Sequence, residues 1–249
     1  MQKIYGYMRK ACQEFELIED GDRIAVGVSG GKDSLVLLAG LAGMRRFYEK
    51  KYEIAAVTLD PRFGGECGDY SSVEELCRKL GIEFKLIPTD IGEIVFDIRK
   101  EKSPCSLCAK MRRGALHDAA KALGCNKLTL GHNNDDVIET FIMNLFREAR
   151  VGCFSPKSFL SRKEITVIRP LVFAPEKDVM SCCRRNGFEI VKSKCPADKH
   201  TERENTKNWL EEMEKKDRGF KQRVFHALRE SGVNGWGFRE KTIKSNNEE

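Results

Sequence analysis

Short apolar runs alternate with longer segments of helical periodicity along most of the chain. The runs have the length of strands and occupy residues 23–28, 54–59, 82–87, 127–130, 165–168 and 188–191. The segments predicted to be helical include residues 35–48, 71–80, 91–100, 106–123, 135–149 and 175–186. Strands that alternate with helices form a parallel sheet covered on both faces. We therefore predict an α/β protein with a doubly wound parallel sheet, whose ligands bind at the carboxyl ends of its strands.

A glycine-rich loop follows the first predicted strand and leads into a helix. Its sequence is SGGKDS, formed by Ser29, Gly30, Gly31, Lys32, Asp33 and Ser34. The glycines let backbone N–H groups approach an anion closely, the helix start adds partial positive charge, and the lysine adds a full one. The loop differs from the Walker A motif, in which Ser or Thr follows the lysine. The pattern therefore indicates a pyrophosphate cradle of another kind, with a tight glycine-rich turn as the structural alternative.

Further polar residues stand at the ends of two other predicted strands. Asp60 follows the strand at 54–59, and the sequence GHNNDD at 131–136 follows the next strand but one. The carboxyl ends of parallel strands meet at one edge of a sheet, so these residues are expected near the glycine-rich loop. Asp135 and Asp136 also suit the positive start of a helix, and stabilisation of that helix is the alternative interpretation. For His132, a loop histidine with satisfied hydrogen bonds and a nucleotide contact are equally consistent with the sequence.

Cys105 and Cys108 form a C-x-x-C pair just ahead of a predicted helix. Arg112 and two further basic residues lie nearby in the sequence, and positive charge favours the thiolate forms. Two thiolates can share one metal centre, but a stable centre needs further ligands. No second C-x-x-C and no nearby pair of histidines occurs in the sequence. A redox pair, a structural zinc site and simple packing are open alternatives at this point.

The loop SGGKDS after a short apolar strand resembles the PP-loop ATP pyrophosphatase family, and the resemblance extends over about residues 23–195. The stretch PCSLCAKMRRGALHDAAKALGCNKLTLGHNNDD at 104–136 is very similar to tRNA 2-thiocytidine synthetases of the TtcA type. PP-loop proteins cleave ATP between the α and β phosphates and adenylate a substrate. The resemblance implies that residues 29–34 bind ATP with Mg²⁺, and that Leu59 and Gly131 frame the adenine beside His132.

The same resemblance implies an oxygen-sensitive [4Fe-4S] cluster held by three cysteines. Its ligands would be Cys105, Cys108 and a distant third cysteine, for which Cys195 is the best match. One iron would then have no protein ligand. The surroundings of Cys195 depart from the family pattern, because Ala197–His200 stands where a Gly-Ser-Gln-like run is expected. A PP-loop enzyme that makes lysidine would have no use for these three cysteines.

The activity that the resemblance implies is ATP-dependent, iron–sulfur-dependent tRNA thiolation. The C2 oxygen of a tRNA pyrimidine, with cytidine 32 as the best match, would be adenylated and replaced by sulfur. Asp60 would orient metal or substrate, Arg112 would neutralise phosphate charge or contact RNA, and either Asp135 or Asp136 would be essential. One alternative is tRNA 2-thiouridine synthesis. Enzymes of that group usually carry Cys/His clusters near both termini, whereas residues 1–22 contain only Cys12 and residues 201–249 contain no cysteine, which disfavours this alternative. Another is a nucleotide- or iron–sulfur-sensing module without turnover.

Composition bears on the partners and the domains. Lys and Arg exceed Asp and Glu by 44 to 38 in 249 residues, and the resulting net charge of +6 allows a nucleic-acid partner without requiring one. The sequence shows neither a secretion signal nor a run of about 18 apolar residues, which favours a cytoplasmic protein without a membrane partner.

The expected partners are tRNA, a sulfur donor (sulfide or a cysteine desulfurase) and a second copy in a homodimer. We predict a helical segment at 1–22, a PP-loop domain with the Fe–S site at 23–195, and a basic helical extension at 196–249 with a disordered tail.

Overall fold

A six-stranded sheet forms the centre of the protein, in the order β3-β2-β1-β4-β6-β5. The computed structural model describes residues 1–100, 104–197 and 202–237. The strands are β1 Asp22–Gly27, β2 Tyr52–Asp60, β3 Glu83–Pro88, β4 Lys127–Thr129, β5 Lys157–Leu160 and β6 Ile165–Ile168. Neighbouring strands are parallel, except that β5 is antiparallel to β6. The predicted α/β class with a doubly wound parallel sheet is therefore confirmed, except for the antiparallel edge strand β5.

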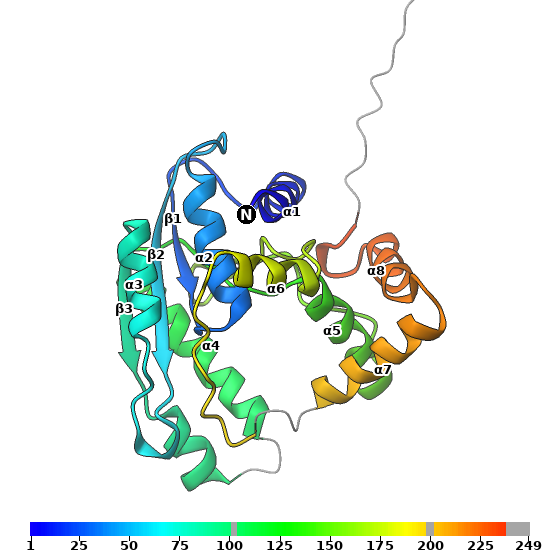
Figure 1. Ribbon diagram of the computed structural model, residues 1–249. Coiled ribbons are helices and arrows are strands. Elements are labelled where there is room, and N and C mark those ends of the chain that lie inside the picture. Colours follow the sequence, from blue (N-terminus) through cyan, green and yellow to red (C-terminus); the bar gives the residue numbers. More distant parts are fainter. Residues whose placement is uncertain (101–103, 198–201, 238–249) are drawn as a thin grey trace, which may run out of the picture.

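Helices lie on both faces of this sheet (Figure 1). One face is covered by α1 Gln2–Glu14, α2 Lys32–Met44, α3 Ser71–Leu80 and α6 Glu176–Arg185, and the other by α4 Pro104–Ala122. Successive side chains of a strand point to opposite faces, and β1 shows this directly. Ile24 and Val26 belong to the core beneath α2, whereas Ala25 belongs to the core beneath α4.

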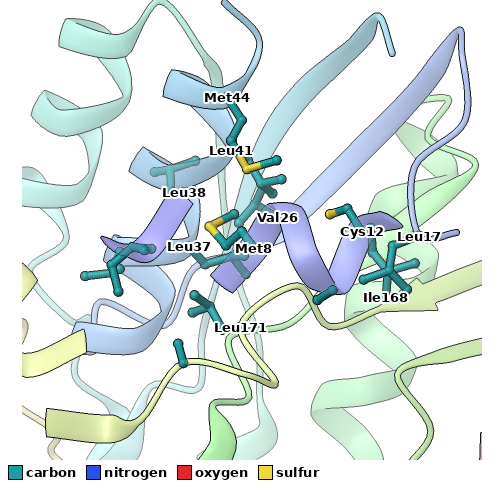
Figure 2. Close-up of a cluster of buried hydrophobic side chains, with 14 of the residues drawn as sticks. Met8, Cys12, Leu17, Val26, Leu37, Leu38, Leu41, Met44, Ile168 and Leu171 are labelled. Atoms are coloured by element: carbon teal, nitrogen blue, oxygen red, sulfur yellow. The ribbon is translucent and has the colours of Figure 1, made fainter. Parts of the chain in front are cut away.

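The larger core fixes α2 against the sheet. Figure 2 shows Met8 and Cys12 from α1 together with Val26 and four side chains of α2, which are Leu37, Leu38, Leu41 and Met44. The four α2 side chains are fully buried. Because α2 is apolar on nearly all sides, it cannot shift without exposing this surface to water. The loop that precedes α2 is therefore attached to a rigid element.

Two C-terminal helices pack on α5 Asn134–Arg147 rather than on the sheet. They are α7 Glu202–Lys216 and α8 Phe220–Ser231. The predicted helical extension therefore contains two helices, separated at Gly219, whose φ is +87°. Beyond α8, the indole of Trp236 is fully buried and donates a hydrogen bond to Phe154 O at 2.8 Å. The predicted disordered tail falls on residues 238–249, which lie outside the described residues.

Two local predictions differ from the structure. Residues 188–191 were expected to form a strand but lie outside the sheet, where Val191 N–H donates to Gly30 O at 3.0 Å. The antiparallel edge strand β5 was not predicted at all. Residues 91–100 were predicted to be helical, and a helix is present, although Glu93–Arg99 are of the π type. Among the described residues, no helix is both long enough and apolar enough to cross a membrane.

Candidate active site

The glycine-rich loop forms the turn between β1 and α2. Ser29 N–H donates to Ser34 Oγ at 3.2 Å, Gly31 N–H donates to Ser29 Oγ at 3.3 Å, and Ser34 Oγ donates to Gly31 O at 2.8 Å. Gly31 is the N-cap of α2, and no side chain of the described residues caps this helix end. The first N–H groups of a helix are anion donors because they have no acceptor within the helix. The loop is therefore built to receive an anion on the backbone of α2.

Gly30 is the position in this loop that tolerates no side chain. Its φ is +80°, and a Cβ there would lie 2.6 Å from Cβ and Cγ2 of Val191. We expect Gly30→Ala to lower the free energy of unfolding by about 1–3 kcal/mol, because it combines a strained φ with a clash. Gly31→Ala is the matched control, since Gly31 has φ of −78° and a Cβ there would lie 3.4 Å from Ser29 Oγ. Urea unfolding of the two variants tests this, and equal losses would contradict it.

Lys32 is neutralised by two carboxylates. Its Nζ lies 2.8 Å from Asp33 Oδ2 and 2.9 Å from Glu176 Oε1. Burial lowers the pKa of Lys32, but the negative charges of Asp33 and Glu176 outweigh it and raise the pKa overall. Asp33 Oδ1 also accepts from Asn133 Nδ2 at 2.8 Å, which ties the loop to the residues after β4. Lys32 is therefore fully charged, and its ammonium is held in place.

A cavity of about 550 Å³, the first cavity, lies beside this loop. Its lining includes Ser29, Asp33, Ser34, Leu59, Gly131 and His132, all of which the sequence predicted to bind nucleotide. A Cβ on Gly131 would lie 3.0 Å from the carbonyl carbon of Asp33 and 3.1 Å from Ser34 N. Glycine at 131 therefore lets the loop after β4 approach the start of α2. The sequence did not predict three further lining residues, Phe154, Arg169 and Arg203.

A second cavity, of about 560 Å³, adjoins the first. Ser29, Leu59 and Arg112 line both cavities. The second cavity is also lined by residues after β2, including Asp60, and by residues 189–194. The basic side chain of Arg112 on α4 is therefore exposed to both spaces.

Asp60 is buried at the end of β2, and its carboxylate organises the loop that follows. Oδ1 accepts from Arg62 N–H at 3.1 Å, and Oδ2 accepts from Gly68 N–H at 2.9 Å. The predicted position of Asp60 near the glycine-rich loop is reproduced, since both contribute to the second cavity. These hydrogen bonds add a structural role that the sequence did not indicate.

Asp135 and Asp136 lie at the start of α5 and line neither cavity. Asp136 Oδ2 accepts from Asn133 N–H at 2.9 Å, completing a capping box, and Asp136 Oδ1 accepts from Arg203 Nη1 at 3.0 Å. Asp135 Oδ2 accepts from Glu176 N–H at 2.7 Å, and Asp135 Oδ1 pairs with Lys221 Nζ at 3.0 Å. Both carboxylates thus hold α5 to neighbouring elements, in agreement with the helix-start interpretation.

His132 is a neutral acceptor in this structure. Its Nδ1 accepts a hydrogen bond from Arg169 Nε at 3.2 Å, and its ring lies 4.7 Å from that of Phe154. Burial lowers its pKa to about 3, and the positive charges of Arg169 and Arg203 add to this effect. The imidazole therefore stays neutral at physiological pH, which leaves Nε2 as its N–H donor.

The depressed pKa of His132 predicts a pH dependence of stability. Folding favours the neutral form, so stability is complete above the ordinary pKa of 6.5 and is lost as the pH falls toward about 3. Over this range wild-type protein should lose up to about 1.4 kcal/mol per pH unit relative to His132→Gln, which cannot take up this proton. Urea unfolding at several pH values measures the difference, and parallel profiles would contradict the assignment.

The two cysteines of the C-x-x-C pair lie in the first turns of α4, Cys105 exposed and Cys108 buried. Burial raises the pKa of the Cys108 thiol, the positive charge of Arg112 opposes the rise, and the charges of Cys195 and Cys105 add to it. The Cys108 thiol is therefore within electrostatic range of both Cys105 and Cys195. Within residues 1–100, 104–197 and 202–237, no group of three or more His, Cys, Asp or Glu side chains has converged into a metal-binding arrangement.

The side chains of Cys105, Cys108 and Cys195 are chemically suitable ligands for an iron–sulfur cluster. Cys108 on α4 lies within electrostatic range of its neighbour Cys105 and of Cys195 from a separate segment, and iron–sulfur clusters are held by cysteine thiolates. Arg112 supplies positive charge beside them. The same arginine lines the first cavity, beside the glycine-rich loop. Arg112 is therefore common to the surroundings of the cysteines and to the cavity at this loop.

The fold and the site define an α/β nucleotide-binding protein of the PP-loop type. The profile of the PP-loop domain family matches residues 5–213. A tRNA-cytidine(32) 2-sulfurtransferase from Geobacter sulfurreducens is 40% identical over 91% of this chain and 89% of its own length. One from Syntrophotalea carbinolica is 42% identical over 78% of this chain and 75% of its own length. The chain therefore belongs to the PP-loop domain family, in the group that contains these sulfurtransferases.

A solved structure supports the fold. The U34-tRNA thiolase NcsA from Methanococcus maripaludis, determined with its [4Fe-4S] cluster, superimposes with a TM-score of 0.70. The two sequences are 23% identical, and the match covers 92% of this chain and 78% of that one. At this level of identity, the similarity establishes a shared architecture.

Proposed function

We propose that this protein is an ATP-dependent, iron–sulfur-dependent tRNA sulfurtransferase that converts cytidine 32 to 2-thiocytidine. The observation that carries the proposal is the position of Arg112. The Arg112 side chain lines the cavity beside the PP-loop, and its positive charge acts on the Cys108 thiol. An activating site and a sulfur-delivering site must adjoin if sulfur is to reach the activated base before water does. The names of the sulfurtransferase relatives support cytidine 32 as the target.

The first half of the reaction needs an anion site and a fixed nucleophile. The C2 oxygen of cytidine attacks the α-phosphorus of ATP, the bond to the bridging oxygen of the β-phosphate breaks, and pyrophosphate leaves. N–H groups at the start of α2 would hold the β and γ phosphates together with Lys32. Mg²⁺ that accompanies ATP would neutralise further charge, and Asp60 is the carboxylate we assign to orient metal or substrate. Arg112 would neutralise charge on the α-phosphate.

The second half replaces the activated oxygen. Hydrosulfide attacks C2, the C2–O bond breaks, AMP leaves with the oxygen, and the proton of the attacking sulfur is released as the C=S bond forms. Cys105, Cys108 and Cys195 would hold the [4Fe-4S] cluster through three irons, with burial at Cys108 limiting access of water from that side. When bound, the cluster would supply a fourth iron that can hold hydrosulfide close to the base. On the basis of the family resemblance, we assign an essential role to either Asp135 or Asp136.

Further proposals rest on the family resemblance. The sulfur donor is sulfide or a cysteine desulfurase, the protein acts in the cytoplasm, and two copies form a homodimer. The chain is divided into an N-terminal helical segment at 1–22, the PP-loop domain at 23–195 and a C-terminal extension from residue 196.

The proposed reaction is tested by mass spectrometry of tRNA nucleosides from cells with and without the gene. We expect 2-thiocytidine to disappear in its absence and other thiolated nucleosides to stay at their normal levels. Expression of the intact gene should restore it. Loss of a 2-thiouridine instead, or no change in any thiolated nucleoside, would refute the proposed function.

A further inference from the structure

One carboxylate is shared by the lysine of the PP-loop and a lysine of α7. Lys32 Nζ lies 2.9 Å from Glu176 Oε1, and Lys207 Nζ lies 2.9 Å from Glu176 Oε2. Glu176 begins α6, and its position is fixed because its N–H donates to Asp135. The side chains of Lys32, Glu176 and Lys207 are 18%, 25% and 28% exposed, so solvent screens their charges only in part.

Lys32 must give up part of this arrangement to contact a phosphate. Its ammonium also contacts Asp33 at 2.8 Å, and Asp33 is itself held by Asn133. An ammonium between two carboxylates presents little net charge to an anion. Asp33 adjoins Lys32 in the chain and cannot be moved far from it. The availability of Lys32 therefore depends on how well Glu176 is neutralised by another cation.

We propose that Lys207 is a positioning residue for ATP, which neutralises Glu176 and thereby releases Lys32 to the phosphates. The inference rests on the proposed ATP binding and concerns its control by α7. The charges of the group cancel, because two ammoniums, Lys32 and Lys207, face the carboxylates of Asp33 and Glu176. Without Lys207 the group has one net negative charge beside the loop that receives ATP, and Glu176 pairs with Lys32 alone.

Arg203 holds α7 in the position that this role requires. It lies one turn before Lys207 on the same helix, donates to Asp136 Oδ1 at 3.0 Å and to Thr140 Oγ1 at 3.2 Å, and lines the first cavity. Leu210 of the same helix is buried against α5. These contacts on both sides of Lys207 limit its movement, so α7 delivers a fixed positive charge to Glu176.

The test is a charge-compensation cycle read out by binding. Calorimetry with α,β-methylene-ATP and Mg²⁺, in the absence of tRNA, gives Kd for the wild type, Lys207→Met, Glu176→Gln and the double variant. We expect Lys207→Met to weaken binding by about tenfold and Glu176→Gln to tighten it, because one unit of charge beside the site is lost or gained. The double variant restores the net charge and should bind within about twofold of the wild type. Lys207→Arg should also bind normally.

Lys215→Met is the matched control, since it removes the same charge from a solvent-exposed position on the same helix. It should leave Kd unchanged. Equal weakening by Lys207→Met in the presence and absence of Glu176→Gln would overturn the inference. If Lys207→Met does not fold, Glu176→Gln still decides, because a Kd no tighter than that of the wild type would overturn it as well. Failure of the wild type itself to bind the analogue would instead refute the proposed ATP site.

Discussion

Replacing Cys105 by serine is expected to abolish iron binding and tRNA thiolation while ATP binding continues. Cys105 is exposed, so the substitution removes a thiolate without disturbing the core. Loss of groups that merely support a metal ligand costs up to about a hundredfold, so loss of a ligand should reduce thiolation by at least that factor. Iron content after anaerobic purification and 2-thiocytidine formed in vitro are the two measurements.

The control for this prediction is a cysteine at the opposite end of the sheet. Cys125 precedes β4 and packs in the smaller core beneath α4. Cys125→Ala should keep both iron and thiolation, because this thiol is far from the loops that follow the strands. A Cys105→Ser protein that holds as much iron as the wild type and forms the same amount of 2-thiocytidine would show that the cysteine assignment is wrong.

Replacing Lys32 by methionine is expected to impair formation of AMP while iron binding continues. We expect kcat/KM for tRNA-dependent formation of AMP to fall by about 10²–10³-fold, because the ammonium that we propose to neutralise the leaving pyrophosphate is removed. Iron content should not change, since Lys32 and the cysteines lie on different elements. Quantification of AMP and pyrophosphate with saturating tRNA measures the effect.

Lys177 provides the matched control for Lys32, because it is an exposed lysine that directly follows Glu176 in the sequence. Lys177→Met should retain the wild-type rate. If Lys32→Met lost its iron, the two halves of the site would not be independent. If instead it formed AMP at the wild-type rate, the PP-loop assignment would be incorrect.

The sequence was sufficient for the parallel strands of the sheet, the PP-loop and the helix that carries Cys105 and Cys108, because each depends on a local pattern. Alternation of apolar runs with helical segments predicted the parallel strands, and SGGKDS predicted an anion loop at the first strand end. Residues 188–191 show the limit of this reasoning. Their apolar character resembles that of a strand, but Val191 bonds to Gly30 of the PP-loop instead of a neighbouring strand. Whether this segment joins the sheet or the PP-loop depends on a contact between residues far apart in the chain.

The residues that the sequence missed in the site also come from distant segments. Arg169 directly follows β6, and the strand-end rule could have identified it. Arg203 and Lys207 had no such signal, because they belong to a charged helix whose periodicity does not say which carboxylates it meets. Asp135 and Asp136 show the reverse case, since their pattern suggested chemistry and their contacts are with helix ends and cations.

The central claim is that the C2 oxygen of cytidine is adenylated and then displaced by sulfur within one space. The most direct test uses tRNA with ¹⁸O at C2 of cytidine 32, incubated anaerobically with the iron-loaded protein, ATP, Mg²⁺ and sulfide. Mass spectrometry of the AMP then reports where the oxygen goes. We predict one ¹⁸O atom in AMP for each 2-thiocytidine formed. Unlabelled AMP, with ¹⁸O recovered in water, would contradict adenylation of the base.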